Sequence, residues 1–156
     1  MHQLAEEIKA IWSLSILFKT VLYAAIIGFV DYMFLSETEK WFMPLFYSSG
    51  IVLVIGIIVI IVWPKLFYKS WKFDIRENEI YLERGVLTRV YTVAPFKRIQ
   101  HLDVEQSVMD RMFGLGKLVV YTAGTRGADL LIPGLPIQYA EDLRDSLKNL
   151  TNEDAV

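Results

Sequence analysis

The sequence predicts a membrane helical hairpin, followed by a β-rich domain that a C-terminal helix closes. Three observations indicate this fold class: residues 41–64 contain no charged side chain, residues 71–132 alternate apolar and polar side chains, and residues 136–150 repeat apolar side chains at helical spacing. About 20 apolar residues can cross a bilayer as a helix, and a period of two is typical of half-buried strands. A mean hydropathy of +0.36 is high for a soluble domain and low for a membrane bundle, so we expect one part of each kind.

Residues 1–70 form the predicted membrane anchor. Its helices are expected at about 14–35 and 44–63, joined by a turn at residues 36–40, with the first residues at the membrane interface. Aromatic side chains near the ends of both segments match the aromatic belts of membrane interfaces. A signal peptide is the alternative for the first segment, but the start of the chain is acidic where such a leader is basic.

Two charges, Lys19 and Asp31, lie within the first apolar segment. They are 12 positions apart, or about 18 Å along a helix, so each could reach a different headgroup layer by snorkelling. Alternatively, Asp31 could meet a cation from a partner helix, or both charges could line a polar path. Lysines are more frequent at the two ends of the anchor than in its turn, which predicts a multi-pass protein of the cell membrane with cytoplasmic termini.

Residues 71–150 form the predicted β-rich domain, a tail follows at 151–156, and every arginine of the chain lies beyond Trp71. A short helix is expected at 108–113, after the potential cap Ser107. Alternating and β-branched segments, separated by Gly and Pro, predict strands at 71–76, 80–83, 86–93, 99–106, 117–122 and 128–132.

The C-terminal helix is expected to close a curved sheet or small barrel. Pro136 suits the first turn of a helix, and the acidic residues that follow it favour the helix dipole. The apolar face that should pack on the sheet consists of Ala140, Leu143, Leu147 and Leu150.

The stretch FKRIQHLDVEQSVMDRMFGLGKLVVYTAGT at residues 96–125, followed by LLIPGL at 130–135, resembles the bacterial membrane-associated PH-like family, the YdbS-like proteins. The resemblance implies two membrane helices just ahead of one PH-like domain. It also implies a partner, because such proteins often accompany a longer relative that carries several PH-like domains. The matching features are Arg84-Gly85-Val86, Arg98-Ile99, Gln106, Arg111, Phe113-Gly114 and Thr122-Ala123-Gly124.

Composition and motifs argue against several function classes. The net charge of −2 is atypical of a nucleic-acid binder, and the lack of cysteine removes disulfides and thiolate chemistry. His101 is the only histidine inside the predicted domain, so no nucleophile, base and orienting group can be assembled. The glycines match no phosphate-binding fingerprint. We therefore expect a protein that is not an enzyme and needs no cofactor.

A metal site is one interpretation of His101, Asp103 and Glu105. These side chains alternate along one predicted strand and should share a face. Steps of about 6.6 Å along a strand make it hard for three such ligands to converge, so the solvent face of an amphipathic strand is favoured. His2 lies at a terminus that we expect to fray.

Four basic residues form the densest basic cluster of the β-rich domain, and with Lys65 and Lys69 they are the candidate contacts for a partner or for lipid headgroups. The first hairpin, Arg76–Glu79, is acidic on balance, unlike the hairpin that binds phosphoinositides in eukaryotic PH domains. The alternative is a set of solvated strand faces that pair with nearby glutamates. The four residues are Arg84, Arg89, Lys97 and Arg98.

Two functions from different classes remain. The first is a membrane-anchored interaction or scaffold module that works with membrane lipids and another membrane protein of the same family. The second is a small transport or lipid-handling component in which Lys19 and Asp31 line a path. Two helices cannot enclose a path, so the second function requires a homo-oligomer.

Overall fold

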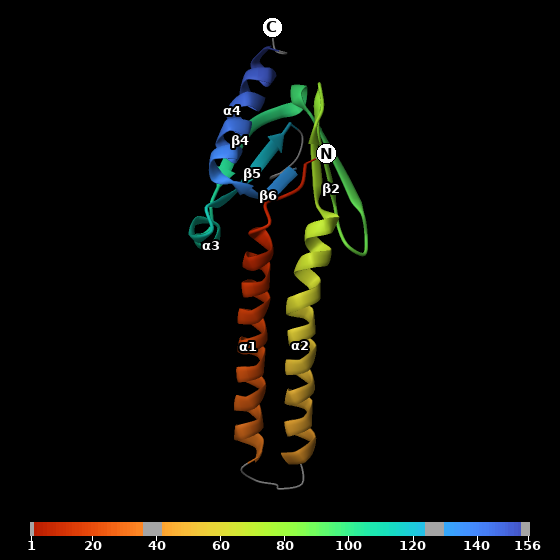
Figure 1. Ribbon diagram of the computed structural model, residues 1–156, viewed down its shortest axis with the longest axis vertical. Coiled ribbons are helices and arrows are strands. Elements are labelled where there is room, and N and C mark those ends of the chain that lie inside the picture. The colour runs from red at the N-terminus through yellow and green to blue at the C-terminus, as the bar shows by residue number, and fades with distance from the viewer. Residues whose placement is uncertain (1, 36–41, 124–129, 154–156) are drawn as a thin grey trace. The chain divides into compact units, whose positions relative to one another are not determined.

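The chain divides into two compact units (Figure 1). Unit 1 consists of Met1–Ile11 and Leu66–Val156, and unit 2 consists of Trp12–Lys65. Both ends of the predicted anchor at 1–70 thus belong to the unit that contains the strands. The computed structural model describes residues 2–35, 42–123 and 130–153.

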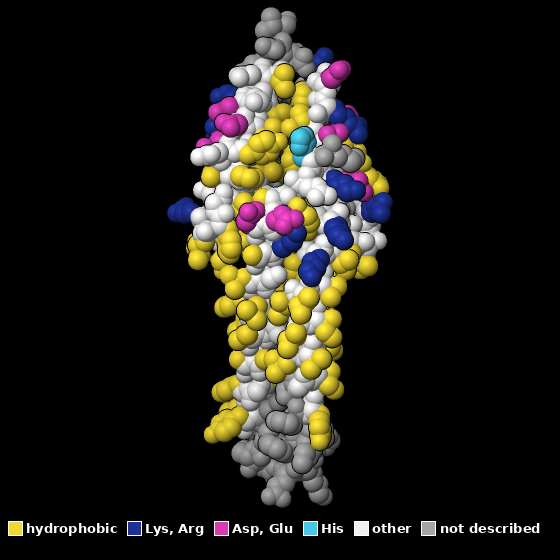
Figure 2. All heavy atoms as spheres, viewed as in Figure 1, with side chains coloured by type: hydrophobic (Ala, Val, Ile, Leu, Met, Phe, Trp, Pro, Cys, Tyr) yellow, Lys and Arg dark blue, Asp and Glu magenta, His cyan; other side chains and the backbone are white. Residues whose placement is uncertain are grey.

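Two long helices supply unit 2 and continue into unit 1: α1 (Ile8–Leu35) and α2 (Phe42–Ser70). Both are long and apolar enough to cross a membrane, with candidate spans at Ile8–Val30 and Gly50–Ser70. On the face drawn in Figure 2, their surface within unit 2 is hydrophobic, whereas charged side chains gather over unit 1. The turn predicted at 36–40 lies outside the described residues.

Both helices extend further than the sequence predicts. α1 begins at Ile8 instead of about residue 14, and α2 passes through Pro64 and ends at Ser70 instead of about residue 63. A proline removes one hydrogen bond from the helix ladder, and here that loss does not end the helix. The predicted ends of both helices were placed where the apolar residues stop, but a helix can continue beyond its apolar part.

The two helices approach closely where glycine leaves room. A Cβ placed on Gly56 of α2 would lie 2.5 Å from Cγ2 of Thr20 on α1. The Thr20 hydroxyl donates a hydrogen bond to the Ile16 carbonyl oxygen at 2.9 Å. Small residues of this kind permit the close backbone approach that membrane helices use for packing.

The described residues of unit 1 form two antiparallel sheets of three strands each, which confirms the predicted fold class. The 3₁₀ helix η2 (Phe96–Arg98) joins the sheets, α3 (Val108–Met112) joins β4 to β5, and α4 (Ile137–Glu153) follows β6. Each sheet keeps its strands in chain order: β1 (Lys72–Ile75), β2 (Glu79–Arg84) and β3 (Val90–Pro95) in the first, and β4 (Ile99–Glu105), β5 (Leu115–Thr122) and β6 (Leu130–Pro136) in the second.

The strand predicted at 86–93 is displaced along the chain: the observed strand, β3, begins at Val90 and ends at Pro95. Arg84 pairs with Val90, which leaves residues 85–89 as the loop between β2 and β3. Gly85 has φ +112°, and a Cβ at this position would collide with the Thr88 carbonyl oxygen. The β-branched composition predicted a strand, but the tight turn at Gly85 removes these residues from the sheet.

The core of unit 1 lies between the sheets and α4. α4 packs on β4, β5, β6 and η2. Ala140, Leu143 and Leu147 are buried as predicted, whereas Leu150 is 40% exposed and its predicted burial is wrong. Leu150 lies near the C-terminal end of α4, where the helical repeat continues although the side chain has less of the sheet to cover.

The N-terminal segment is part of this core, so the expected fraying of His2 is wrong. The His2 N–H donates to the Phe73 carbonyl at 2.7 Å, and the Phe73 N–H donates back at 3.1 Å. Leu4 and Ile8 are buried. The Ala5 N–H donates to the Gly134 carbonyl at 2.8 Å, and Gly134 has φ +65° with Ile8 packed against its backbone.

Candidate functional site

The predicted basic cluster does not form one site. Arg84 ends β2 and Arg89 is the last residue of the β2–β3 loop, whereas Lys97 and Arg98 lie on η2, beyond the far end of β3. The six residues of β3 correspond to about 20 Å, so the two pairs occupy opposite ends of this strand. The structure therefore divides the four predicted residues into two separate basic pairs.

Most of these basic side chains have nearby partners within unit 1. The Arg84 guanidinium lies 6.0 Å from the Trp71 ring centroid, and Arg89 Nη1 lies 3.8 Å from Glu83 Oε1. Arg98 Nη2 donates a hydrogen bond to the Ala123 carbonyl oxygen at 3.0 Å. These contacts are the kind expected if the basic residues simply lie on solvated strand faces and pair with neighbouring groups.

The remaining predicted residues are dispersed. Lys97 is exposed on η2, Lys69 is exposed in the last turn of α2, and Lys65 is exposed at the end of unit 2. Lys19 is exposed on α1, and the structure does not describe the side chain of Asp31.

His101, Asp103 and Glu105 share the exposed face of β4, and neighbouring side chains contact each of them. His101 stacks on Tyr121 with ring centroids 4.1 Å apart, and its Nε2 lies 3.5 Å from Asp103 Oδ2. Glu105 pairs with Lys117 across the sheet at 2.8 Å. This arrangement is typical of cross-strand pairs on a solvated sheet face.

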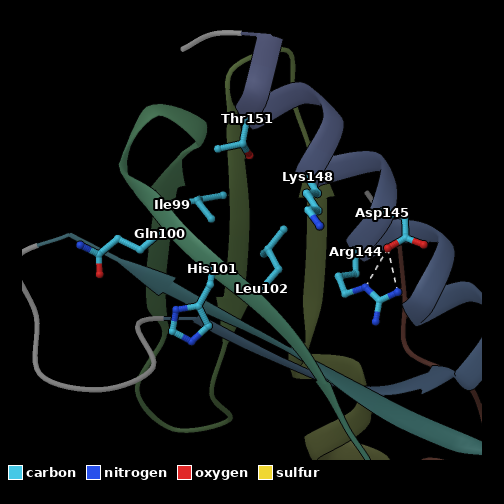
Figure 3. Close-up of a pocket in the computed structure, with 8 residues that line it drawn as sticks. All are labelled: Ile99, Gln100, His101, Leu102, Arg144, Asp145, Lys148 and Thr151. Carbon is cyan, nitrogen blue, oxygen red and sulfur yellow. Dashed lines mark hydrogen bonds and ion pairs between the residues drawn. The ribbon is translucent and has the colours of Figure 1, made fainter.

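A groove of about 400 Å³ lies between β4 and the C-terminal half of α4 (Figure 3). Ile99 and Leu102 lie on the side of β4 that faces α4, and Gln100 and His101 of the same strand also line the groove. Residues three positions apart can share this side because the register with β5 shifts between Ile99 and His101. Such a bulge inserts one extra residue and re-aims the side chains beside it.

The opposite wall of the groove is polar and partly basic. Arg144 forms an ion pair with Asp145, with Nη2 and Oδ1 2.7 Å apart. Lys148 lies one turn further along α4, and among the described residues it has no ion pair. Thr151 completes this wall. The groove thus combines two apolar side chains of β4, which lie beside Gln100 and His101, with a cation on α4 that has no ion pair among the described residues.

The β4 side of the groove also carries an open sheet edge. Among the described strands, β4 pairs only with β5 and is the outermost strand of its sheet. The outer edge of such a strand presents backbone N–H and C=O groups to any extended chain that approaches it. An extended peptide can add to such an edge as a further strand, and pockets beside the edge then receive its alternate side chains.

Comparison with known families agrees with this architecture. The family model of the bacterial PH domain matches residues 13–151, a range that includes most of α1, all of α2, both sheets and most of α4. The chain belongs to the bacterial PH domain family.

One curated relative of this bacterial PH domain protein is UPF0699 transmembrane protein YdbS of Bacillus subtilis (strain 168). The two are 30% identical over 102 residues, which cover 65% of this chain and 62% of the relative. The chain thus spans less than two thirds of the length of that relative. No solved structure matches the chain. Together with the two apolar helices, the transmembrane relative supports a membrane protein.

The sequence did not identify the groove of this bacterial PH domain. Its β4 side depends on the shifted register at Gln100, and a uniform alternation over 99–106 gives no sign of that shift. Its α4 side had a visible signal, because Arg144 and Lys148 are four positions apart and must share a helix face. The position of that face beside β4 comes from the tertiary fold.

Proposed function

We propose that this protein is a membrane-anchored, non-catalytic docking module whose groove between β4 and α4 binds an extended segment of another membrane protein of the same family. The observation that carries this proposal is the groove along the open edge of β4. The partner is a protein because an extended chain can use the backbone groups of that edge, which a small molecule or a lipid headgroup uses poorly.

The chemistry of the groove favours an acidic segment. Ile99 and Leu102 can receive an apolar side chain, while Lys148 can meet a carboxylate that stands on the α4 side of the added strand. Arg144 already forms an ion pair with Asp145, so a carboxylate of the partner would interact more favourably with Lys148 than with Arg144. A charge at the rim of a groove chiefly sets partner choice and association rate.

The anchor supplies the setting in which such a weak groove suffices. We propose that α1 and α2 cross the cell membrane, with both termini and unit 1 in the cytoplasm, as the lysine distribution predicts. A partner in the same membrane meets the groove at a high effective concentration, so a modest contact area can hold a complex.

Crosslinking inside living cells tests the groove. A photo-crosslinking amino acid at Thr151, which lines the groove, should form an adduct with a membrane protein, and peptide mapping should place the crosslink in an acidic, extended segment. The same amino acid at Gln138, exposed on the first turn of α4 and outside the groove, is the matched control. Equal adducts from both positions would disprove docking in the groove.

A charge reversal refines the test. Lys148→Glu should reduce the Thr151 adduct severalfold, because it opposes the carboxylate of the partner. Asn149→Glu introduces the same side chain at the next exposed position of α4, outside the groove, and should leave the adduct unchanged. Loss of the adduct in both variants would show that general charge, and not the groove, governs the association.

A further inference from the structure

Two surface features of unit 1 expose apolar side chains without an evident structural role. Leu87, at the tip of the β2–β3 loop, is 89% exposed. On α3, Val108 is 79% exposed and Met112 is 73% exposed, and their spacing of four places them on one helix face. Val108 and Met112 thus form a small exposed apolar face, and contiguous exposed apolar patches can mark a contact with a partner or a membrane.

The β2–β3 loop lies at the end of its sheet where α2 arrives. Lys72, the first residue of β1, pairs with Glu83 near the end of β2, and β1 follows α2 after one intervening residue. The contact between Arg84 and the Trp71 ring confirms this proximity. Residues 85–89 therefore lie beside the point where the chain leaves α2.

α3 lies at the end of its sheet where α1 departs. It joins the end of β4 to the start of β5, and Leu115 of β5 pairs with Pro136 at the end of β6. Gly134 of β6 contacts Ile8, the first residue of α1. In Figure 1 the loop and α3 lie at the end of unit 1 where residues 8–11 and 66–70 are found.

We propose that the β2–β3 loop and α3 form a second membrane contact, in which Leu87, Val108 and Met112 enter the headgroup layer of a bilayer that contains anionic lipid. The proposal rests on the membrane anchoring proposed above. The candidate spans begin at Ile8 and end at Ser70, and both of these residues belong to unit 1, the unit that carries the loop and α3.

Charge at the loop fits this occupant. Arg84 and Arg89 stand on either side of Leu87, and within the described part of the chain only Arg89 has an acidic partner, Glu83 at 3.8 Å. Apolar side chains flanked by basic ones are typical of segments that lie in the interface of an anionic membrane. Gly85 fixes the turn that presents Leu87, because its φ of +112° excludes a side chain there.

Fluorescence quenching in lipid nanodiscs tests the contact on the full-length protein. The chain has no cysteine, so single substitutions Thr88→Cys and Met112→Cys can carry an environment-sensitive fluorophore next to Leu87 and on α3. Glu77→Cys, in the exposed turn between β1 and β2, is the matched control. Ile57→Cys, on the exposed surface of α2, reports whether the anchor itself is in lipid.

In nanodiscs of phosphatidylcholine and phosphatidylglycerol, a shallow lipid-borne nitroxide should quench the labels at Thr88 and Met112 severalfold more than the label at Glu77. Leu87→Glu should return the Thr88 label to the level of the control. Because each basic residue near an anionic surface contributes about fivefold in affinity, Arg89→Gln should reduce lipid contact of the loop measurably, and omission of phosphatidylglycerol should have a similar effect.

Two outcomes would overturn the contact. In the first, aqueous iodide quenches the labels at Thr88 and Met112 as strongly as the label at Glu77, which would show that both labels are exposed to water. In the second, the labels are shielded from iodide and from the nitroxide alike, which would indicate that a protein, such as a second copy, covers them. The Ile57 label separates this failure from that of the anchor. If the Ile57 label is quenched by deep nitroxide while the loop is not, only the second contact fails.

Discussion

The helices α3 and α4 have similar sequence signatures and opposite surroundings. Both carry apolar side chains at helical spacing, although Pro136, which was predicted in the first turn of α4, is the last residue of β6. On α4, Ala140 and Leu147 are buried against the sheets, whereas on α3 no residue is buried. The difference shows that apolar periodicity predicts a helix with one apolar face. The rest of the fold decides whether other parts of the protein cover that face.

The short length of α3 explains part of this difference. It has five residues, and its start is held by a capping box in which Ser107 and Asp110 exchange hydrogen bonds. Local capping can therefore support α3 without burial. α4 has 17 residues and a broad apolar face, so its stability depends on packing.

The largest effect expected from this comparison concerns Leu147, which is 1% exposed. Leu147→Asp places a charge in the core and should lower the free energy of unfolding by about 3–5 kcal/mol. Leu150→Asp, one turn later on an exposed side chain, should change it by less than about 0.5 kcal/mol. Denaturant unfolding in mild detergent measures both, and equal losses would show that α4 does not pack as described.

The N-terminal segment offers an intermediate case of a buried apolar face. Gly134→Ala adds a methyl group where Ile8 atoms lie 2.9 Å away and where φ is +65°. We expect a loss of about 1–3 kcal/mol in unfolding free energy. Faster hydrogen exchange at the Ala5 amide, which donates to Gly134, should accompany it. Unchanged exchange at Ala5 would mean that the segment docks without this close approach.

On α3 the same kind of substitution should have almost no effect on stability. Val108→Asp and Met112→Asp change exposed side chains and should shift the unfolding free energy by less than about 0.5 kcal/mol. Lipid quenching should nevertheless fall, at the Met112→Cys label for Val108→Asp and at the Thr88→Cys label for Met112→Asp. A large loss of stability in either variant would remove the contrast between α3 and α4.

The smallest effect concerns the solvated face of β2. Partial burial raises the pKa of Tyr81, and the neighbouring Glu83 and Tyr91 add to this shift, while Arg76 opposes it. Because the folded state holds the phenol proton more tightly, stability is unaffected below the ordinary tyrosine pKa of 10 and declines as pH rises above it. Tyr81→Phe should weaken this decline in alkaline unfolding curves. An identical alkaline decline in the variant would contradict the assigned shift.

The long apolar segments and the period of two predicted the fold class, because both are local properties that any membrane helix or half-buried strand must show. The buried residues Leu143 and Leu147 followed from the same kind of pattern. The features that the sequence missed depend on backbone pairing, which the apolar and polar pattern does not encode. The loop at 85–89 follows from the pairing of Arg84 with Val90, and the docking of His2 depends on Phe73.

The sequence by itself thus determined which segments are helices, which are strands, and that the chain belongs near a membrane, since composition and periodicity encode local preference and burial. Only the tertiary structure decided that Lys97 and Arg89 lie at opposite ends of β3, that β4 and α4 form a groove beside Lys148, and that the apolar face of α3 stays open. The physical reason is that these outcomes depend on strand register and on the packing of distant segments, which no local pattern specifies.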